Sequence, residues 1–89
     1  MEVIVKGQFI RDITSYKNKA LRKAIDDIVN NLETSERLTQ IKNLKKLNQY
    51  KYFYRIKISD TYRIGLRVHE NKVWLAPFGH RSNFYKKFP

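Results

Sequence analysis

The chain has 89 residues, of which 42% are hydrophobic, and this length and composition allow one domain with a modest core. It has no cysteine, which excludes disulfides and thiolate metal sites, and its two histidines lack the carboxylate cluster that a metal site would need. No apolar run is long enough for a signal peptide or a membrane span, so we expect one soluble, cytoplasmic domain over residues 1–89.

The positive charge is concentrated in the second half of the chain. Nineteen Lys and Arg residues against eight Asp and Glu residues give a net charge of +11. Residues 1–41 contain seven basic and six acidic side chains, whereas residues 42–89 contain twelve basic and two acidic ones. Self-repulsion on this scale destabilises a folded domain unless an anion relieves it. The second half therefore predicts a polyanionic partner, either a nucleic acid or an acidic protein.

The first half predicts one strand and two helices. Residues 2–6 fit a short strand, and residues 9–18 fit a weakly patterned helix. Apolar residues then recur at three- and four-residue steps, at Ala20, Leu21, Ala24, Ile25, Ile28, Val29 and Leu32. Polar residues fill the positions between them, which predicts an amphipathic helix of about four turns with its apolar stripe in the core. A connecting stretch follows, with apolar anchors at Leu38, Ile41, Leu44 and Leu47.

From Tyr52 the apolar residues recur at every second position, which is typical of strands. The expected elements are a strand over 52–58, a turn over 59–61, a strand over 62–69, a tight turn at 70–71 and a strand over 72–78. Pro77 places the end of the last strand at a sheet edge or a bulge. The fold class is therefore α+β: a short N-terminal strand, two helices, and an antiparallel β-meander with the helices packed on its apolar face.

The two turn lengths also predict the strand register. They set apolar residues opposite apolar residues, pairing Ile58 with Tyr62, Ile56 with Ile64, Tyr54 with Leu66, Leu66 with Leu75 and Val68 with Val73. The same register makes the other face basic, with Lys57 opposite Arg63, Arg55 opposite Gly65, and Arg67 opposite Trp74.

Like charges directly opposite each other destabilise a sheet, so this face is either an anion site or a row of long side chains splayed into water. The net charge of this half favours the anion site. Gly65 would let a ligand approach the backbone closely, and Arg67 could form a cation–π pair with Trp74.

The chain ends in GHRSNFYKKFP, residues 79–89, where cations alternate with aromatic rings. This segment is either a solvated, frayed tail or one wall of the same anion site. The sequence offers no glycine-rich phosphate loop and no Ser/His/Asp arrangement, so neither nucleotide cofactors nor serine-type catalysis is expected. Clustered cations with a proton donor and acceptor suit RNA cleavage by the neighbouring 2′-hydroxyl, because they stabilise charge on the phosphorane.

The block YRIKISDTYRIGLRV (54–68), followed by GHRSNFY (79–85), resembles the RelE family of toxin–antitoxin mRNA interferases, within the RelE/ParE superfamily. The order of the expected elements is also similar. The resemblance implies a toxin that enters the A site of the small ribosomal subunit and cleaves mRNA there without a cofactor. It also implies a cognate antitoxin protein that neutralises the toxin in a hetero-oligomer. The strong positive charge predicts an acidic or amphipathic antitoxin segment, which would cover the apolar sheet edge or the basic face.

Matched by position, the resemblance implies roles for individual residues. Lys57 would be the general base, Arg63 would hold the scissile phosphate, and Arg81 would stabilise charge or protonate the leaving 5′-oxygen. Tyr85 would stack on a codon base, a contact that gains about 1–3 kcal/mol for each base. The candidate RNA-binding cations are Arg55, Arg67, Lys86 and Lys87.

His80 is a further candidate acid or base, since imidazole suits proton transfer near neutral pH, or else a surface hydrogen-bonding residue. Arg55 stands where some members of the family have lysine, and an arginine can hold phosphate but is a poor proton acceptor.

Two alternative functions stay open. A ParE-like toxin would have the same fold but would act on DNA gyrase without cleaving RNA. A non-catalytic module would bind RNA or the ribosome, with an affinity that falls steeply with salt.

Overall fold

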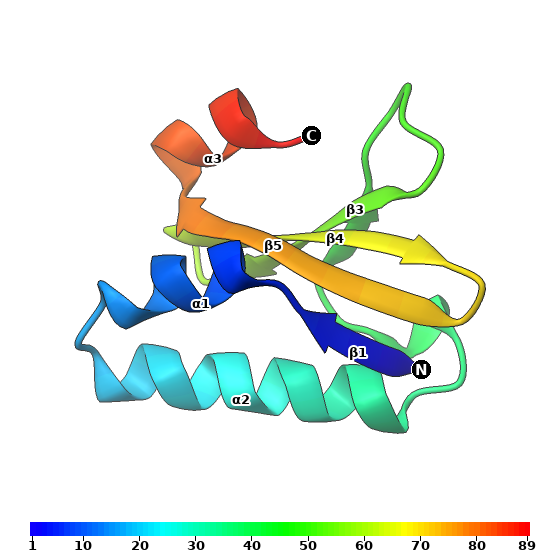
Figure 1. Ribbon diagram of the computed structural model, residues 1–89, viewed down its shortest axis with the longest axis horizontal. Coiled ribbons are helices and arrows are strands. Elements are labelled where there is room, and N and C mark those ends of the chain that lie inside the picture. The colour runs from blue at the N-terminus through cyan, green and yellow to red at the C-terminus, as the bar shows by residue number, and fades with distance from the viewer.

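The computed structural model describes residues 1–89 as a five-stranded sheet with helices on both faces (Figure 1). In chain order the elements are β1 (Glu2–Val5), α1 (Gly7–Thr14), α2 (Lys19–Thr34), the 3-10 helix η1 (Leu38–Gln40), β2 (Leu44–Lys46), β3 (Phe53–Ile58), β4 (Tyr62–His69), β5 (Lys72–His80) and α3 (Arg81–Lys87). The expected α+β fold is confirmed. None of its helices combines the length and the apolar composition needed to cross a membrane.

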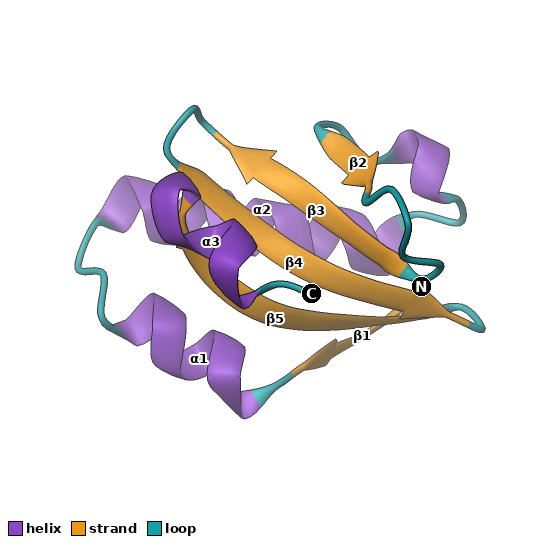
Figure 2. Ribbon diagram, turned by 90° about the horizontal axis from the view of Figure 1, so that it is seen from above, coloured by secondary structure: helices purple, strands orange, loops and turns teal.

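The strands lie in the order β1-β5-β4-β3-β2. β3, β4 and β5 form the predicted antiparallel meander, and β1 pairs with β5 in parallel. α1 and α2 lie on one side of the sheet and α3 on the other, as Figures 1 and 2 show from two directions. We call the side under α1 and α2 the covered face and the side under α3 the second face.

The predicted register is confirmed at every pair. Ile58 lies opposite Tyr62 in the β3–β4 hairpin, and Val68 lies opposite Val73 in the β4–β5 hairpin. The tight turn between β4 and β5 has positive φ at both Glu70 and Asn71, the backbone geometry that a two-residue hairpin requires.

The prediction for Pro77 is confirmed. β1 pairs only with residues 72–75 of β5, so the end of β5 lies at the open edge of the sheet, where the backbone N–H of Phe78 donates to Asp12 Oδ2 at 3.0 Å. The register between β4 and β5 also shifts between Ile64 and Leu66, so a bulge accommodates Ala76 and Pro77, whose ring removes one backbone donor from the ladder.

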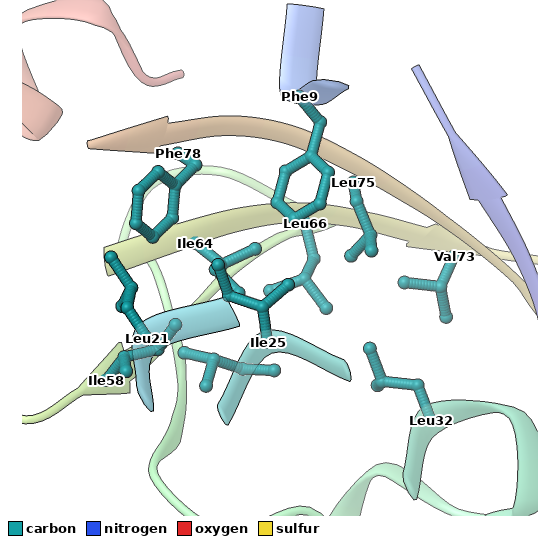
Figure 3. Close-up of a cluster of buried hydrophobic side chains, with 11 residues drawn as sticks. Phe9, Leu21, Ile25, Leu32, Ile58, Ile64, Leu66, Val73, Leu75 and Phe78 are labelled. Carbon is teal, nitrogen blue, oxygen red and sulfur yellow. The ribbon is translucent and has the colours of Figure 1, made fainter. Parts of the chain in front are cut away.

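The core fills the space between the covered face and the two helices. Asn18 caps the start of α2 by accepting a hydrogen bond from the backbone N–H of Leu21 at 3.1 Å. From there the apolar stripe of α2 faces the sheet, and Phe9 of α1 joins it with its ring edge against Phe78 (Figure 3). The buried residues of this core are Phe9, Leu21, Ile25, Leu32, Ile56, Ile58, Ile64, Leu66, Val73, Leu75 and Phe78.

Three elements differ from the expectation. α1 spans Gly7–Thr14 rather than residues 9–18, and Asn18 instead caps α2. Residues 44–46 form β2 at the edge of the sheet, where the sequence indicated only a connection with apolar anchors. The last residues are not a frayed tail, because α3 covers part of the second face and buries Phe84 and Phe88 against it. The helices therefore cover both faces rather than one.

Candidate nucleic-acid interface

Four cations lie together on the second face, across three neighbouring strands. The register places Lys45 of β2 opposite Arg55 of β3, and Lys57 of β3 opposite Arg63 of β4. Cross-strand partners point to the same side of a sheet, so all four side chains project from this face. We call these four residues the basic face. Lys45 was missed in the sequence because the three residues of β2 show no alternation that would predict a strand.

Arg63 is unusual among these cations because it is buried, with only 9% of its surface exposed. Its Nη1 donates hydrogen bonds to the backbone oxygens of Ser59 at 3.3 Å and Tyr62 at 3.0 Å. Its Nε has no hydrogen-bond partner. No carboxylate pairs with it, since the two ion pairs of the molecule involve other residues. A guanidinium held in this way has a fixed direction and an uncompensated charge.

The turn over residues 59–61 connects three of the predicted site residues. The backbone oxygen of Ser59 accepts from Arg63, and the carboxylate of Asp60 forms an ion pair with Lys57 Nζ at 3.2 Å. The backbone oxygen of Thr61 accepts a hydrogen bond from the N–H of Arg81 at 2.7 Å, which ties the start of α3 to the turn. This one turn thus orients Lys57 of β3, Arg63 of β4 and the start of α3.

Asn43 also orients residues of the basic face, in this case two residues of β3. Its backbone oxygen accepts hydrogen bonds from Arg55 Nη1 at 2.9 Å and from the N–H of Lys57 at 3.2 Å. Its φ of 63° lies in the left-handed region, which asparagine tolerates better than most residues. An open hollow of about 310 Å³ is lined by Asn43, Lys57, Ser59 and Asp60. This arrangement could not be predicted from the side-chain pattern, because it depends on backbone atoms of a loop.

Arg81 and Tyr85 lie four residues apart on α3, on the same side of the helix. Phe84 and Phe88 point into the sheet, and Asn83 lines a cavity on the side of α3 that faces α1. Helical geometry therefore places Arg81 and Tyr85 on the opposite side of α3, toward β4 and β3. Both are exposed, Tyr85 by 51%, so α3 presents a cation and an aromatic ring beside the basic face.

Gly65 does not leave room for a ligand, so that expectation is wrong. A Cβ added at Gly65 would lie 3.0 Å from the ring of Phe88 and 2.9 Å from the backbone oxygen of Ala76. The space above the glycine is filled by Phe88, whose ring also contacts Phe53 with centroids 5.4 Å apart. The missing side chain therefore allows α3 to dock closely on the sheet.

His80 and Lys87 lie away from the basic face. His80 is the cross-strand partner of Tyr62, on the covered face, and its Nδ1 accepts a hydrogen bond from the N–H of Ser82 at 3.1 Å. It therefore caps the first turn of α3. His80 and Lys87 both line a small cavity of about 160 Å³ that is closed on the other side by Asp12 of α1.

The two remaining predicted RNA-binding residues are exposed. Lys86 lies in the last turn of α3. Arg67 lies on the second face, four residues further along β4 than Arg63, and its Cζ is 4.9 Å from the centroid of the Trp74 ring. The predicted cation–π pair is therefore confirmed. In total the structure brings together Arg55, Lys57 and Arg63, with Arg81 and Tyr85 on the adjoining side of α3.

Solved structures of similar fold cover nearly the whole chain. A chain of the RelB–RelE antitoxin–toxin complex from Methanococcus jannaschii is 27% identical and superposes with a TM-score of 0.81, over 97% of this chain and 99% of that one. A chain of the toxin–antitoxin complex RelBE2 from Mycobacterium tuberculosis is 18% identical, with a TM-score of 0.70 over 90% and 96% of the two chains. YafQ from E. coli is 11% identical, with a TM-score of 0.66 over 94% and 97%.

The fold is thus the one that RelE-like toxins share. The chain is similar in fold to RelE-like toxins over nearly its whole length, which confirms the resemblance indicated by the sequence. No protein-family model matches the sequence, and no curated protein sequence matches it.

Proposed function

We propose that this RelE-like protein is the toxin of a toxin–antitoxin system and cleaves mRNA in the ribosomal A site. The observation that carries the proposal is the environment of Arg63. Its guanidinium is buried without a carboxylate partner, and Arg63 lies directly opposite Lys57 on the adjacent strand. A buried charge without a counter-ion is unfavourable, and like charges opposite each other add to the repulsion. An RNA phosphate bound at the basic face would relieve both.

In the proposed reaction the ribose 2′-oxygen attacks the adjacent phosphorus while the bond to the 5′-oxygen breaks. Arg63 holds the phosphate, since a fixed, planar guanidinium matches its geometry. Arg81, exposed on α3, stabilises the charge that develops on the phosphorane. Tyr85 stacks on a base and so positions the ribose for in-line attack.

Proton transfer completes the reaction. Lys57, released from Asp60 and deprotonated, takes the proton of the 2′-hydroxyl with its free amine, and the leaving 5′-oxygen receives one from water, with Arg81 stabilising its charge. Lys57 lies at the open hollow beside turn 59–61, within reach of a phosphate on Arg63. His80 is not assigned to this step, because it caps α3 on the side that faces α1.

The proposed partners are the ribosome with its mRNA and a cognate antitoxin. The charge of +11 suits binding to ribosomal RNA, and an acidic antitoxin segment would relieve the same repulsion. The similar chains from M. jannaschii and M. tuberculosis come from toxin–antitoxin complexes, which supports an antitoxin partner here.

The proposal is tested by induced expression and primer extension on cellular mRNA. We expect growth arrest and cuts within codons. Arg81→Ala should reduce cleavage by about a hundredfold, as is typical when a charge-stabilising group is lost, and Tyr85→Ala by about tenfold to a hundredfold. Both side chains are exposed, so the variants should fold. Lys23→Ala, an exposed change on α2 across the sheet, is the matched control for lost charge.

The proposal fails if both variants arrest growth and cleave mRNA like the unmodified protein. Growth arrest without any mRNA cuts, together with inhibition of gyrase supercoiling by the purified protein, would instead support a ParE-like activity. Binding to ribosomes without arrest would support a non-catalytic module.

A further inference from the structure

The second face continues beyond the basic face into a group of aromatic rings around one arginine. Phe53, Arg67 and Trp74 are consecutive cross-strand partners on β3, β4 and β5, so their side chains form one row across the sheet. Tyr50 extends this row, with its ring edge against Phe53 at a centroid distance of 6.2 Å. We call these four residues the aromatic platform. We propose that it is a second RNA subsite, which binds an unpaired nucleotide outside the one that is cleaved.

The platform is accessible to a ligand. Tyr50 is 45% exposed, Arg67 is exposed, and the Phe53 and Trp74 rings are partly exposed. Contiguous exposed apolar side chains often mark a site of interaction. Their clustering on one row distinguishes them from single exposed apolar residues, which need no explanation.

Arg67 is held in a way that suits a nucleotide base. Its guanidinium lies 4.9 Å from the centre of the Trp74 ring, and the side chain is exposed. Flat guanidinium groups and aromatic rings are the surfaces on which proteins stack unpaired RNA bases. The N–H groups at the rim of the guanidinium can still bind a phosphate.

The charge balance favours an anionic ligand. The second half of the chain has two acidic residues, Asp60, which pairs with Lys57, and Glu70, whose Oε1 lies 3.4 Å from His69 Nε2, and neither forms an ion pair with Arg67. No carboxylate therefore neutralises Arg67. A nucleic acid supplies the phosphate and the bases together, whereas an acidic peptide supplies only the charge.

The position relative to the basic face fits one continuous strand of RNA. Arg63 and Arg67 lie four residues apart on the same strand and face, a separation of about 13 Å along β4. Phe88 lies between them, over Gly65, and its ring contacts Phe53 of the platform. The inference rests on the proposed function for the identity of the RNA, but the platform can be tested without ribosomes or cleavage.

Trp74 is the only tryptophan of the chain, so its fluorescence reports on this site alone. We expect hexauridylate RNA to quench it in titrations of the purified protein. Arg67→Ala should weaken binding about tenfold, the loss of one stacked base. Arg67→Lys should cause most of that loss, because lysine keeps the charge but has no flat surface. Lys23→Ala is again the control. The Trp74→Phe variant, which lacks the fluorescent residue, is titrated with labelled RNA to measure binding independently of tryptophan fluorescence.

Four outcomes would overturn the inference. RNA binding without quenching would place the RNA elsewhere. An Arg67→Lys variant that binds as well as the unmodified protein would mean that charge alone matters. Tighter quenching by polyglutamate, with displacement of RNA, would make the platform a protein-docking surface. Because Arg67 is exposed, thermal melts of its variants should match the unmodified protein. Platform variants that cleave mRNA normally and bind hexauridylate normally would contradict this inference and leave the proposed function standing.

Discussion

The two faces of the sheet differ in the kinds of residues that lie opposite each other, although the same strands form both faces. On the covered face the central cross-strand pairs are apolar, and residues such as Ile64 and Leu66 are fully buried. On the second face cations oppose cations, and Arg63 is buried without a counter-ion. A face that is optimised for stability would not keep such pairs. The contrast separates the residues that form the core from those that we propose bind RNA, and substitutions on the two faces should therefore behave differently.

The largest loss of stability is expected on the covered face. Leu32 of α2 is fully buried in the core, so Leu32→Ala should lower the free energy of unfolding by about 2–5 kcal/mol. Ile10→Ala is the matched control, because Ile10 is 48% exposed on α1 and should change stability by less than about 0.5 kcal/mol. Urea denaturation followed by circular dichroism measures both. Equal losses for the two variants would contradict the placement of the core.

Gly65→Ala should be the next largest change, and it acts on the second face. The added methyl group would meet a backbone oxygen at 2.9 Å and the Phe88 ring at 3.0 Å, so α3 must shift or the sheet must strain. We expect a loss of about 1–3 kcal/mol, as for other overpacked sites. mRNA cleavage should also fall, because α3 carries Arg81 and Tyr85.

Gly79 provides the control within the same sheet. It lies on β5, and an added Cβ would meet nothing within 4 Å. Gly79→Ala should therefore leave both stability and cleavage nearly unchanged. If the two alanine variants behaved alike, the close docking of α3 through Gly65 would be wrong.

These two glycines illustrate how far the sequence could predict the molecule. The turn lengths and the alternation of apolar residues fix the register, and with it the pairing of Lys57 with Arg63, because both are local properties. The docking of α3 depends on contacts between residues far apart in the chain, and a segment of seven residues shows too few turns for its pattern to be recognised.

The same reason explains what was missed in the site. The role of Asp60 depends on where a turn brings its carboxylate, and Asn43 acts through its backbone oxygen, which no side-chain pattern reveals. The sequence placed Arg63 on the basic face correctly but gave no indication that it is buried.

Arg63→Met should separate stability from function. Methionine is close in size to the buried part of arginine and removes an uncompensated charge, so the folded protein should be as stable as before or more stable, by about 1 kcal/mol. RNA cleavage should be lost, since the proposed phosphate ligand is gone. Thermal melts and primer extension measure the two effects. A clear loss of stability would mean that the hydrogen bonds from Arg63 to Ser59 and Tyr62 outweigh the charge, and that burial of this arginine is structural.

The smallest change is expected for Asp60→Asn. The ion pair with Lys57 is largely exposed, with side-chain exposures of 40% for Lys57 and 87% for Asp60, and such pairs contribute less than about 1 kcal/mol. Stability should therefore hardly change, and the little that is lost should vanish at high salt, which screens the pair. Cleavage should change more than stability, because the ion pair directs Lys57 toward turn 59–61 and its loss releases the ammonium group into the basic face. Unchanged cleavage together with a large, salt-independent loss of stability would contradict this prediction. The ion pair would then stabilise turn 59–61 rather than position Lys57 for cleavage.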